Sequence, residues 1–136
     1  MELEQQLASV PLLAGLDGRI RRRLAETGKR RTYGPDEEIV RQGSNGTALY
    51  IVLSGTARVE RDGERLGGVK AGDFFGELAL IEEHPRSASV IADAETECLL
   101  FPAWEFTALL EEHPEIAVPI MRALIQRLHR REHHLA

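Results

Sequence analysis

The chain has 136 residues, of which 43% are apolar and 29% charged, and its formal net charge is -5. That length suits one compact domain able to bury a core without disulfides or metal, and the composition excludes a disordered chain. No window reaches the roughly 18 uncharged apolar residues that a membrane span requires, and the negative charge argues against nucleic-acid binding through the overall field.

Two features bear on the compartment and redox chemistry of the chain. Residues 1–4 are acidic or polar apart from Met1 and Leu3, so the basic and hydrophobic regions of a secretory signal are missing, and we expect a cytoplasmic protein. Cys98 stands in an apolar run and is the single cysteine, which can form neither an internal disulfide nor a cysteine-based metal cluster. We expect it to be an inert core residue.

Residues 1–28 carry helical signals. Leu3 and Leu7 lie four apart and share a helix face. Asp17 is a suitable N-cap for a second helix over 18–27, and Gly28 is its predicted stop.

From residue 29 to residue 101 the helical period disappears. Short segments rich in Val, Ile, Tyr and Thr alternate with glycine-containing turns, which predicts a β-roll, barrel or sandwich. The run over 48–53 is the most apolar of the predicted strands. Residues 56–61 and 64–69 are expected to pair across the two-residue turn Asp62-Gly63.

Residues 102–134 are predicted to be helical again. Pro102 suits a first helical position, and an apolar face is supplied by Trp104, Phe106, Leu109 and Leu110. Trp104 is expected to anchor its helix as an apolar contact. Pro119 implies that the last helix either is kinked or begins near Val118. Within that helix a stripe of apolar residues could form a dimer seam or pack on the roll, and both interpretations stay open: Met121, Leu124, Leu128 and Leu135.

The segment 74–88 interrupts the strand pattern and carries the chemistry. Gly76 allows close approach of the backbone to a ligand, and the amides of Leu78 and Ala79 at the start of the next turn are donors for an anion. Arg86 can return a planar guanidinium to the same anion, with the Ser87 hydroxyl as a further donor.

Glu77 stands in the middle of these phosphate donors, and its charge is wrong for a phosphate. A carboxylate is instead a good acceptor for a sugar hydroxyl. A phosphate site and a ribose site side by side indicate a nucleotide.

The order Gly-Glu-Leu-Ala-Leu, a short loop and Pro-Arg-Ser-Ala resembles the phosphate-binding cassette of the cyclic-nucleotide-binding domain family. That family includes the bacterial catabolite activator protein, the regulatory subunits of cyclic-AMP-dependent kinase and cyclic-nucleotide-gated channels. The segments 33–43 and 48–55 are similar to its first strands and glycine turns.

The resemblance implies a mainly β fold with flanking helices. Its core is an eight-stranded β-roll, a jelly-roll-like double-stranded β-helix, over 29–101 with the cassette at 74–88. N-terminal helices over 1–28 and C-terminal lid helices over 102–134 complete a single domain, 1–136.

It also implies roles for individual residues. Glu77 would accept the ribose 2′-hydroxyl, Arg86 would pair with the cyclic phosphate, and Ser87 with the backbone of Leu78 and Ala79 would complete the cradle. On the last helix, Arg131 or Glu132 would contact the base. In this family a Thr after the cassette arginine accompanies cyclic GMP and an Ala cyclic AMP, so Ser87 leaves cyclic AMP as the expected ligand and cyclic GMP as the alternative.

We predict a sensor that signals by repositioning its C-terminal helices, and not an enzyme, because no nucleophile is paired with a base and no carboxylate pair is indicated. Its effector would be a fused domain or an unidentified protein partner. No DNA reader follows the last helix, so no direct DNA binding is expected, and His84 and the histidines of the tail are expected to be surface residues without metal. The alternatives are a degenerate roll that binds no nucleotide, or the sensor piece of a longer regulator, channel or transporter.

Overall fold

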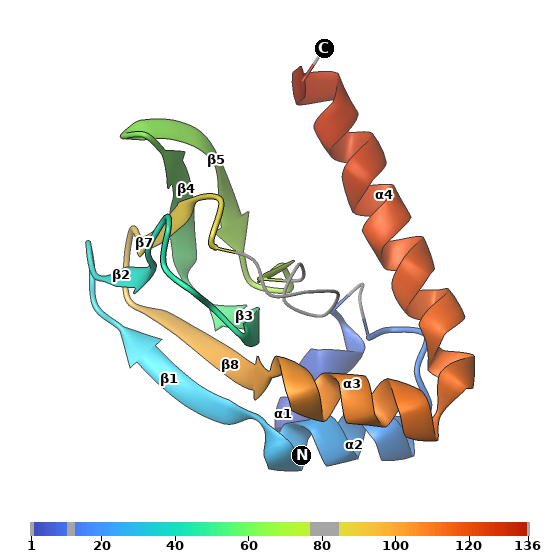
Figure 1. Ribbon diagram of the computed structural model, residues 1–136. Coiled ribbons are helices and arrows are strands. Elements are labelled where there is room, and N and C mark those ends of the chain that lie inside the picture. Colours follow the sequence, from blue (N-terminus) through green and yellow to red (C-terminus); the bar gives the residue numbers. More distant parts are fainter. Residues whose placement is uncertain (1, 11–12, 77–84, 136) are drawn as a thin grey trace.

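The computed structural model describes residues 2–10, 13–76 and 85–135, with side-chain surroundings between Leu3 and Gln126 within those ranges. The described residues form eight strands in two antiparallel sheets, flanked by helices (Figure 1). One sheet has the order β1-β8-β3-β6 and the other β2-β7-β4-β5. The strands are β1 (Lys29–Tyr33), β2 (Glu38–Val40), β3 (Ala48–Ser54), β4 (Thr56–Arg61), β5 (Glu64–Lys70), β6 (Phe74–Phe75), β7 (Ser89–Ala92) and β8 (Thr96–Pro102).

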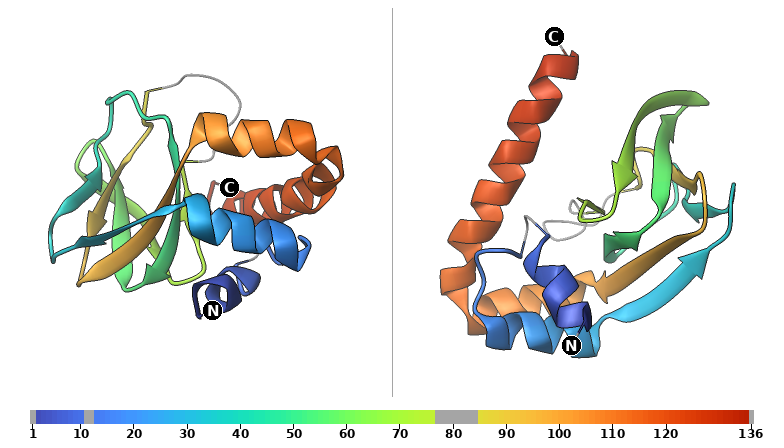
Figure 2. Two further views of the ribbon diagram at one scale, coloured as in Figure 1. Left: turned by 90° about the horizontal axis from the view of Figure 1, so that it is seen from below. Right: turned by 180° about the vertical axis from the view of Figure 1, so that it is seen from behind.

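The helices come before and after the roll, as the sequence predicts. They are α1 (Glu2–Ala8), α2 (Gly18–Thr27), α3 (Ala103–Glu112), the 3₁₀ helix η2 (Pro114–Ile116) and α4 (Ala117–Leu135). Figure 2 shows α1, α2 and α3 gathered at one end of the roll, with α4 extending beside it. The prediction of a mainly β roll with flanking helices is confirmed.

Strand β3 is apolar from Ala48 to Leu53 because both of its faces lie against the core, and its last residue, Ser54, is exposed. Leu49, Ile51 and Leu53 belong to a core cluster that the helices share, whereas Tyr50 and Val52 face a second cluster between the two sheets. Alternate residues of a strand point to opposite faces, so burial on both sides requires a continuous apolar run. The molecule therefore has three layers: helices, the β3-containing sheet and the second sheet.

The second helix begins and ends where its sequence predicts. The Asp17 side chain accepts a hydrogen bond from the backbone N–H of Arg19 at 2.8 Å. Gly28 ends the helix, but its backbone is extended, with φ -71° and ψ 150°, and is not left-handed. Glycine is required there for space, because a Cβ would lie 2.7 Å from Cγ of Leu99 and 2.8 Å from Cε1 of Phe101.

The predicted hairpin is also confirmed. β4 and β5 pair up to Arg61 opposite Glu64, and Asp62 and Gly63 adopt φ values of 55° and 80°. Two consecutive positive φ values are those of a type I′ turn, whose twist suits a two-residue hairpin.

Two expectations for the C-terminal helices need adjustment. Pro102 ends β8 and occupies the N-cap position of α3, so it stands one residue before the first helical position. Pro119 is the third residue of α4, where the missing N–H would have had no helical partner, so the helix begins close to the predicted start at Val118.

The expectation for Trp104 is wrong. Its side chain is 70% exposed, while Phe106 and Leu109 form the buried face of α3. The helix is anchored by those two residues because they point toward α2 and β8, where Phe106 packs edge-on against Phe101 with 6.4 Å between the ring centroids.

Cys98 is a buried residue of β8, as predicted, and its surroundings make the folded state sensitive to alkali. Burial, with a smaller contribution from Glu97, raises the pKa of the thiol from 9.0 to about 12. Well below pH 9 the thiol is neutral whether the chain is folded or unfolded. As the pH rises from 9 toward 12, the unfolded chain releases this proton more readily than the folded one, so the free energy of unfolding should fall.

This prediction is checked by urea denaturation at about pH 8 and about pH 10.5. Because burial also raises the pKa of Tyr33 and of Tyr50, the comparison needs Cys98→Ala, which should lose less stability between the two pH values than the wild type. Equal losses in the two proteins would contradict the assignment to Cys98.

Candidate functional site

The chemistry-bearing segment lies between two short strands. β6 pairs with β3, placing Phe75 opposite Tyr50, and Gly76 follows at once with φ +86°. At the other end, Arg86 and Ser87 precede β7. Glu77, Leu78 and Ala79 lie outside the described residues.

The backbone of Arg86 is fixed by the loop 43–46. The Gly43 N–H donates to the Arg86 carbonyl, and the Arg86 N–H donates to the Ser44 carbonyl, each at 2.8 Å. Asn45 and Pro85 complete this contact as an isolated antiparallel bridge. A loop some forty residues away in sequence therefore sets where the arginine stands.

The Arg86 side chain is partly buried and turned toward β3. Its Nη2 donates to the Ala48 carbonyl at 3.0 Å, and its Cζ lies 5.6 Å from the centroid of the Tyr50 ring. Tyr50 in turn stacks on Phe75, with ring centroids 4.8 Å apart and planes within 7°. The guanidinium is thus held by a carbonyl and an aromatic face.

Gly76 and Arg86, predicted to serve the same anion, are in contact. A Cβ at Gly76 would lie 2.7 Å from Nη1 of Arg86 and 2.6 Å from the Ala48 carbonyl oxygen. With its positive φ, this position suits glycine in both conformation and space. A guanidinium has five N–H donors, so the bond to Ala48 leaves capacity for a planar, bidentate contact with an anion.

The other predicted residues have no described side-chain contact with Arg86. Ser87 is exposed, and its carbonyl accepts from Nε of Arg61 at 3.0 Å. Arg131 and Glu132 fall in the last turns of α4, where side chains lie outside the described part.

Sequence reasoning missed three contributors to this site: Ala48, Tyr50 and Gly46. A Cβ built on Gly46 would overlap the guanidinium of Arg86. Two signals were available. Strand alternation places Tyr50 on the opposite face from Leu49, and the turn cluster that begins at Gly43 contains a second glycine. Neither signal reveals that these residues meet Arg86, because the contact is long-range.

The start of α3 is joined to the same loop. The Ala103 N–H donates to the Thr47 carbonyl at 2.6 Å, one residue before the carbonyl that holds Arg86. The arginine and the first turn of α3 are therefore attached to neighbouring peptide groups.

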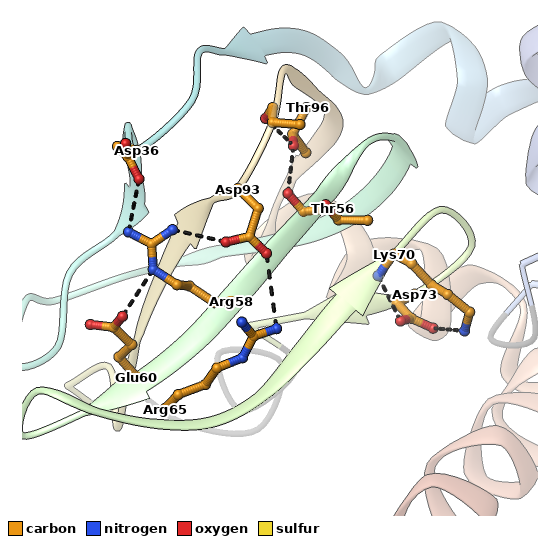
Figure 3. Close-up of polar contacts among 10 residues, drawn as sticks. Asp36, Thr56, Arg58, Glu60, Arg65, Lys70, Asp73, Asp93 and Thr96 are labelled. Atoms are coloured by element: carbon orange, nitrogen blue, oxygen red, sulfur yellow. Dashed lines mark hydrogen bonds and ion pairs between the residues drawn. The ribbon is translucent and has the colours of Figure 1, made fainter.

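A second polar cluster surrounds Arg58 on the second sheet (Figure 3). Its guanidinium donates to Asp36 at 3.1 Å, Glu60 at 2.9 Å and Asp93 at 2.8 Å. Hydrogen bonds to these three carboxylates raise the pKa of Arg58, so its positive charge is already matched and the cluster is not an anion site. It ties β4 to the turns that contain Asp36 and Asp93.

Two features of the described residues bear on metal binding and on membrane insertion. No group of three or more His, Cys, Asp or Glu side chains there comes together as a metal site, and no helix in that part of the chain is long and apolar enough to cross a membrane. His84 and the tail histidines lie outside the residues whose side chains are described.

Comparison with known proteins identifies the family to which the chain belongs. A family model described as the cyclic nucleotide-binding domain matches residues 30–113, which include both β-sheets, Gly76 and Arg86. The chain belongs to this family.

Relatives of this cyclic nucleotide-binding domain have different overall functions. The cAMP-dependent protein kinase regulatory subunit of Hypocrea atroviridis is 34% identical over 79% of this chain and 23% of the relative. Glutaminase 1 of Bradyrhizobium diazoefficiens is 38% identical over 90% of this chain and 20% of the relative. The chain thus spans about a fifth to a quarter of the length of these curated relatives.

Among solved structures, the catabolite activator protein of Thermus thermophilus matches with a TM-score of 0.79 and 33% identity. The match covers 92% of this chain and 61% of that one. The resemblance inferred from the cassette is therefore confirmed at the level of family and fold.

Proposed function

We propose that the chain is a sensor of cyclic AMP in which Arg86 pairs with the cyclic phosphate. The observation that carries this proposal is the partly buried guanidinium in contact with Gly76, held by Ala48 and Tyr50 with donors to spare. Glu77 as the acceptor of the ribose 2′-hydroxyl, the amides of Leu78 and Ala79, and the Ser87 hydroxyl complete the proposed cradle.

Cyclic AMP is favoured over cyclic GMP on two grounds. The relative of Hypocrea atroviridis is named for cyclic AMP, and Ser87 lacks the methyl group of the threonine that accompanies cyclic GMP in this family. Contact of the base with Arg131 or Glu132 belongs to the same proposal.

The experiment is a calorimetric titration of nucleotide-stripped protein with cyclic AMP and then with cyclic GMP. Saturable binding at micromolar or lower concentration, tighter for cyclic AMP, is the expected result. Absence of heat with both nucleotides at two temperatures, together with no rise in melting temperature at millimolar nucleotide, would favour a degenerate roll that acts as an interaction module.

We further propose that binding is signalled through α3 and α4. Arg86 is bonded to the Ala48 carbonyl, and the neighbouring Thr47 carbonyl holds the first turn of α3, so a shift of Arg86 on binding the phosphate would reach α3 through adjacent peptide groups. Coupling of this kind is typically about 1–3 kcal/mol.

Trp104 offers a direct readout of that movement. It is the chain's single tryptophan, is 70% exposed, and is the second residue of α3. Its emission should therefore be typical of indole in water without ligand, and should shift or change in intensity as cyclic AMP is added. An emission spectrum that stays unchanged at saturating nucleotide would argue against repositioning of α3.

The effector is proposed to lie in a fused domain or a separate protein, with this domain as a regulator that is not itself an enzyme. The relatives include a kinase regulatory subunit and a glutaminase, each much longer than this chain. Incubation with cyclic AMP followed by chromatography should return the nucleotide intact.

Self-association through α4 is a further proposal, with a seam that differs from the predicted stripe. Val118, Met121 and Ile125 are about half exposed and are spaced by three and four residues, whereas Leu124 is partly buried against the helical core cluster. Such spacing on an exposed helix face suits pairing with a second copy.

The double variant Met121→Glu, Ile125→Glu should remove this association because it places charges along the seam. Sedimentation velocity is expected to give a dimer for the wild type and a monomer for the variant, with Gln126→Glu as the control. If the wild-type protein sediments as a monomer at a protein concentration 100-fold above that needed for nucleotide binding, this seam is ruled out.

A further inference from the structure

Gly46 is a glycine whose backbone does not require one. Its φ is outside the positive region that five other glycines of the described chain occupy. Yet a Cβ at this position would overlap the Nε, Cζ and Nη2 atoms of Arg86. The guanidinium therefore lies directly over the Gly46 backbone, in space that any larger residue would fill.

The guanidinium has a second neighbour, an aromatic ring that is itself fixed. Tyr50 presents its ring face to Cζ of Arg86 at 5.6 Å, within the range of a cation–π contact. The ring cannot turn away freely, because it stacks on Phe75 from the paired strand β6. The arginine thus contacts the bare backbone of Gly46 and the rigid ring of Tyr50, and it donates a hydrogen bond to the Ala48 carbonyl.

We propose that Gly46 and Tyr50 are positioning residues that form a socket for the Arg86 guanidinium and so fix where the nucleotide phosphate binds. This inference rests on the proposed function, since it concerns the same site. It adds that the arginine is placed before the ligand arrives, and that the residues responsible lie outside the cassette.

Pre-placement matters because an arginine side chain has many rotamers, and much of its conformational entropy would otherwise be lost on binding. The socket also distinguishes arginine from lysine. A planar guanidinium can lie against a glycine backbone and against an aromatic ring, whereas an ammonium group has no plane to match either surface.

The sharpest variant is Gly46→Ala, because its backbone tolerates alanine and the three atoms nearest to the new Cβ all belong to the flexible end of Arg86. We expect it to fold with an unchanged melting temperature and to weaken cyclic AMP about tenfold or more. Gly34→Ala is the matched control, since nothing lies within 4 Å of its Cβ and its φ is not positive. Tyr50→Leu should weaken binding about 5- to 30-fold.

A purely structural role is distinguished by a double-mutant cycle. If both residues act through Arg86, then Gly46→Ala and Tyr50→Leu should each lose most of their effect on cyclic AMP affinity once Arg86 is already alanine. Full additivity of the effects on cyclic AMP affinity would overturn the inference, and so would an affinity of Gly46→Ala equal to that of the wild type. The proposed function stays intact in both cases if Arg86→Ala itself weakens binding.

A second measurement needs no nucleotide. The Nε–H signal of Arg86, assigned by its loss in Arg86→Lys, should have the relaxation of an ordered group in the free wild type and of a mobile one in Gly46→Ala. Equal mobility in both proteins would refute the socket. A wild type with an ordered Arg86 and no affinity for cyclic nucleotides would instead refute the proposed function alone.

Discussion

Replacement of Arg86 by alanine is expected to weaken cyclic AMP binding by at least about 100-fold. Hydrogen bonds between charged groups contribute about 1.5–3 kcal/mol each, and a guanidinium can form two in parallel with one phosphate. The loss should be concentrated in the dissociation rate, because the variant removes contacts within the bound complex. Calorimetry measures the affinity, and binding kinetics on surface-immobilised protein measure the dissociation rate.

Lysine at this position should recover only part of the affinity, since it restores charge without the planar fork. Arg41→Ala is a suitable control: this side chain is 75% exposed and ion-paired with Glu38 three residues away. If Arg86→Ala bound cyclic AMP as tightly as the wild type, the phosphate would have to lie elsewhere and the assignment of the cassette arginine would fail.

Local elements could be predicted from the sequence because their causes are local. Asp17 caps α2 through a bond to the second residue beyond it, and Asp62 with Gly63 turns the hairpin through its own backbone angles. The cassette residues Gly76 and Arg86 could also be identified in the sequence, since a resemblance over a short motif needs no knowledge of distant contacts. The structure brings these two residues together.

Long-range contacts could not be predicted in this way. Gly46 and Arg86 stand forty positions apart, and nothing in either segment indicates that one lies over the other. Gly28 was correctly predicted to end α2, but the reason for a glycine there lies in Leu99 and Phe101 on β8. In each case the need for glycine is created by a neighbour from another part of the chain.

Trp104 illustrates a different limit of prediction from the sequence, which concerns the side chains of a helix that are buried. Its size and apolarity favour burial, but the face of a helix that points inward is set by the packing partner and not by the largest side chain. Here the partner is the α2 and β8 surface, which receives Phe106 and Leu109. The periodicity therefore identified Phe106 and Leu109 correctly as part of the apolar face of α3, but it also assigned Trp104 to that face.

Phe101→Ala is expected to lower the free energy of unfolding by about 3–5 kcal/mol. The side chain is 1% exposed, stands opposite Leu49 in the β3–β8 pair and packs edge-on against Phe106. Its removal opens a cavity where the roll, α2 and α3 meet, and neighbours fixed in strands collapse only in part. A loss of this size is a large fraction of the 5–15 kcal/mol typical of a folded domain and should lower the melting temperature by about 10–20 °C.

Urea denaturation followed by circular dichroism measures the loss, and an unchanged slope with denaturant would show that the unfolded state is unaffected. Leu66→Ala is the control, because Leu66 is also an apolar strand residue but is 53% exposed, and its truncation should change stability by less than about 0.5 kcal/mol. Nucleotide affinity of the folded Phe101→Ala protein should remain measurable at low temperature, since Phe101 faces the helices while Arg86 meets Tyr50, which belongs to the cluster between the sheets. A loss below about 1 kcal/mol would mean that the helical layer is not joined to the roll through this residue.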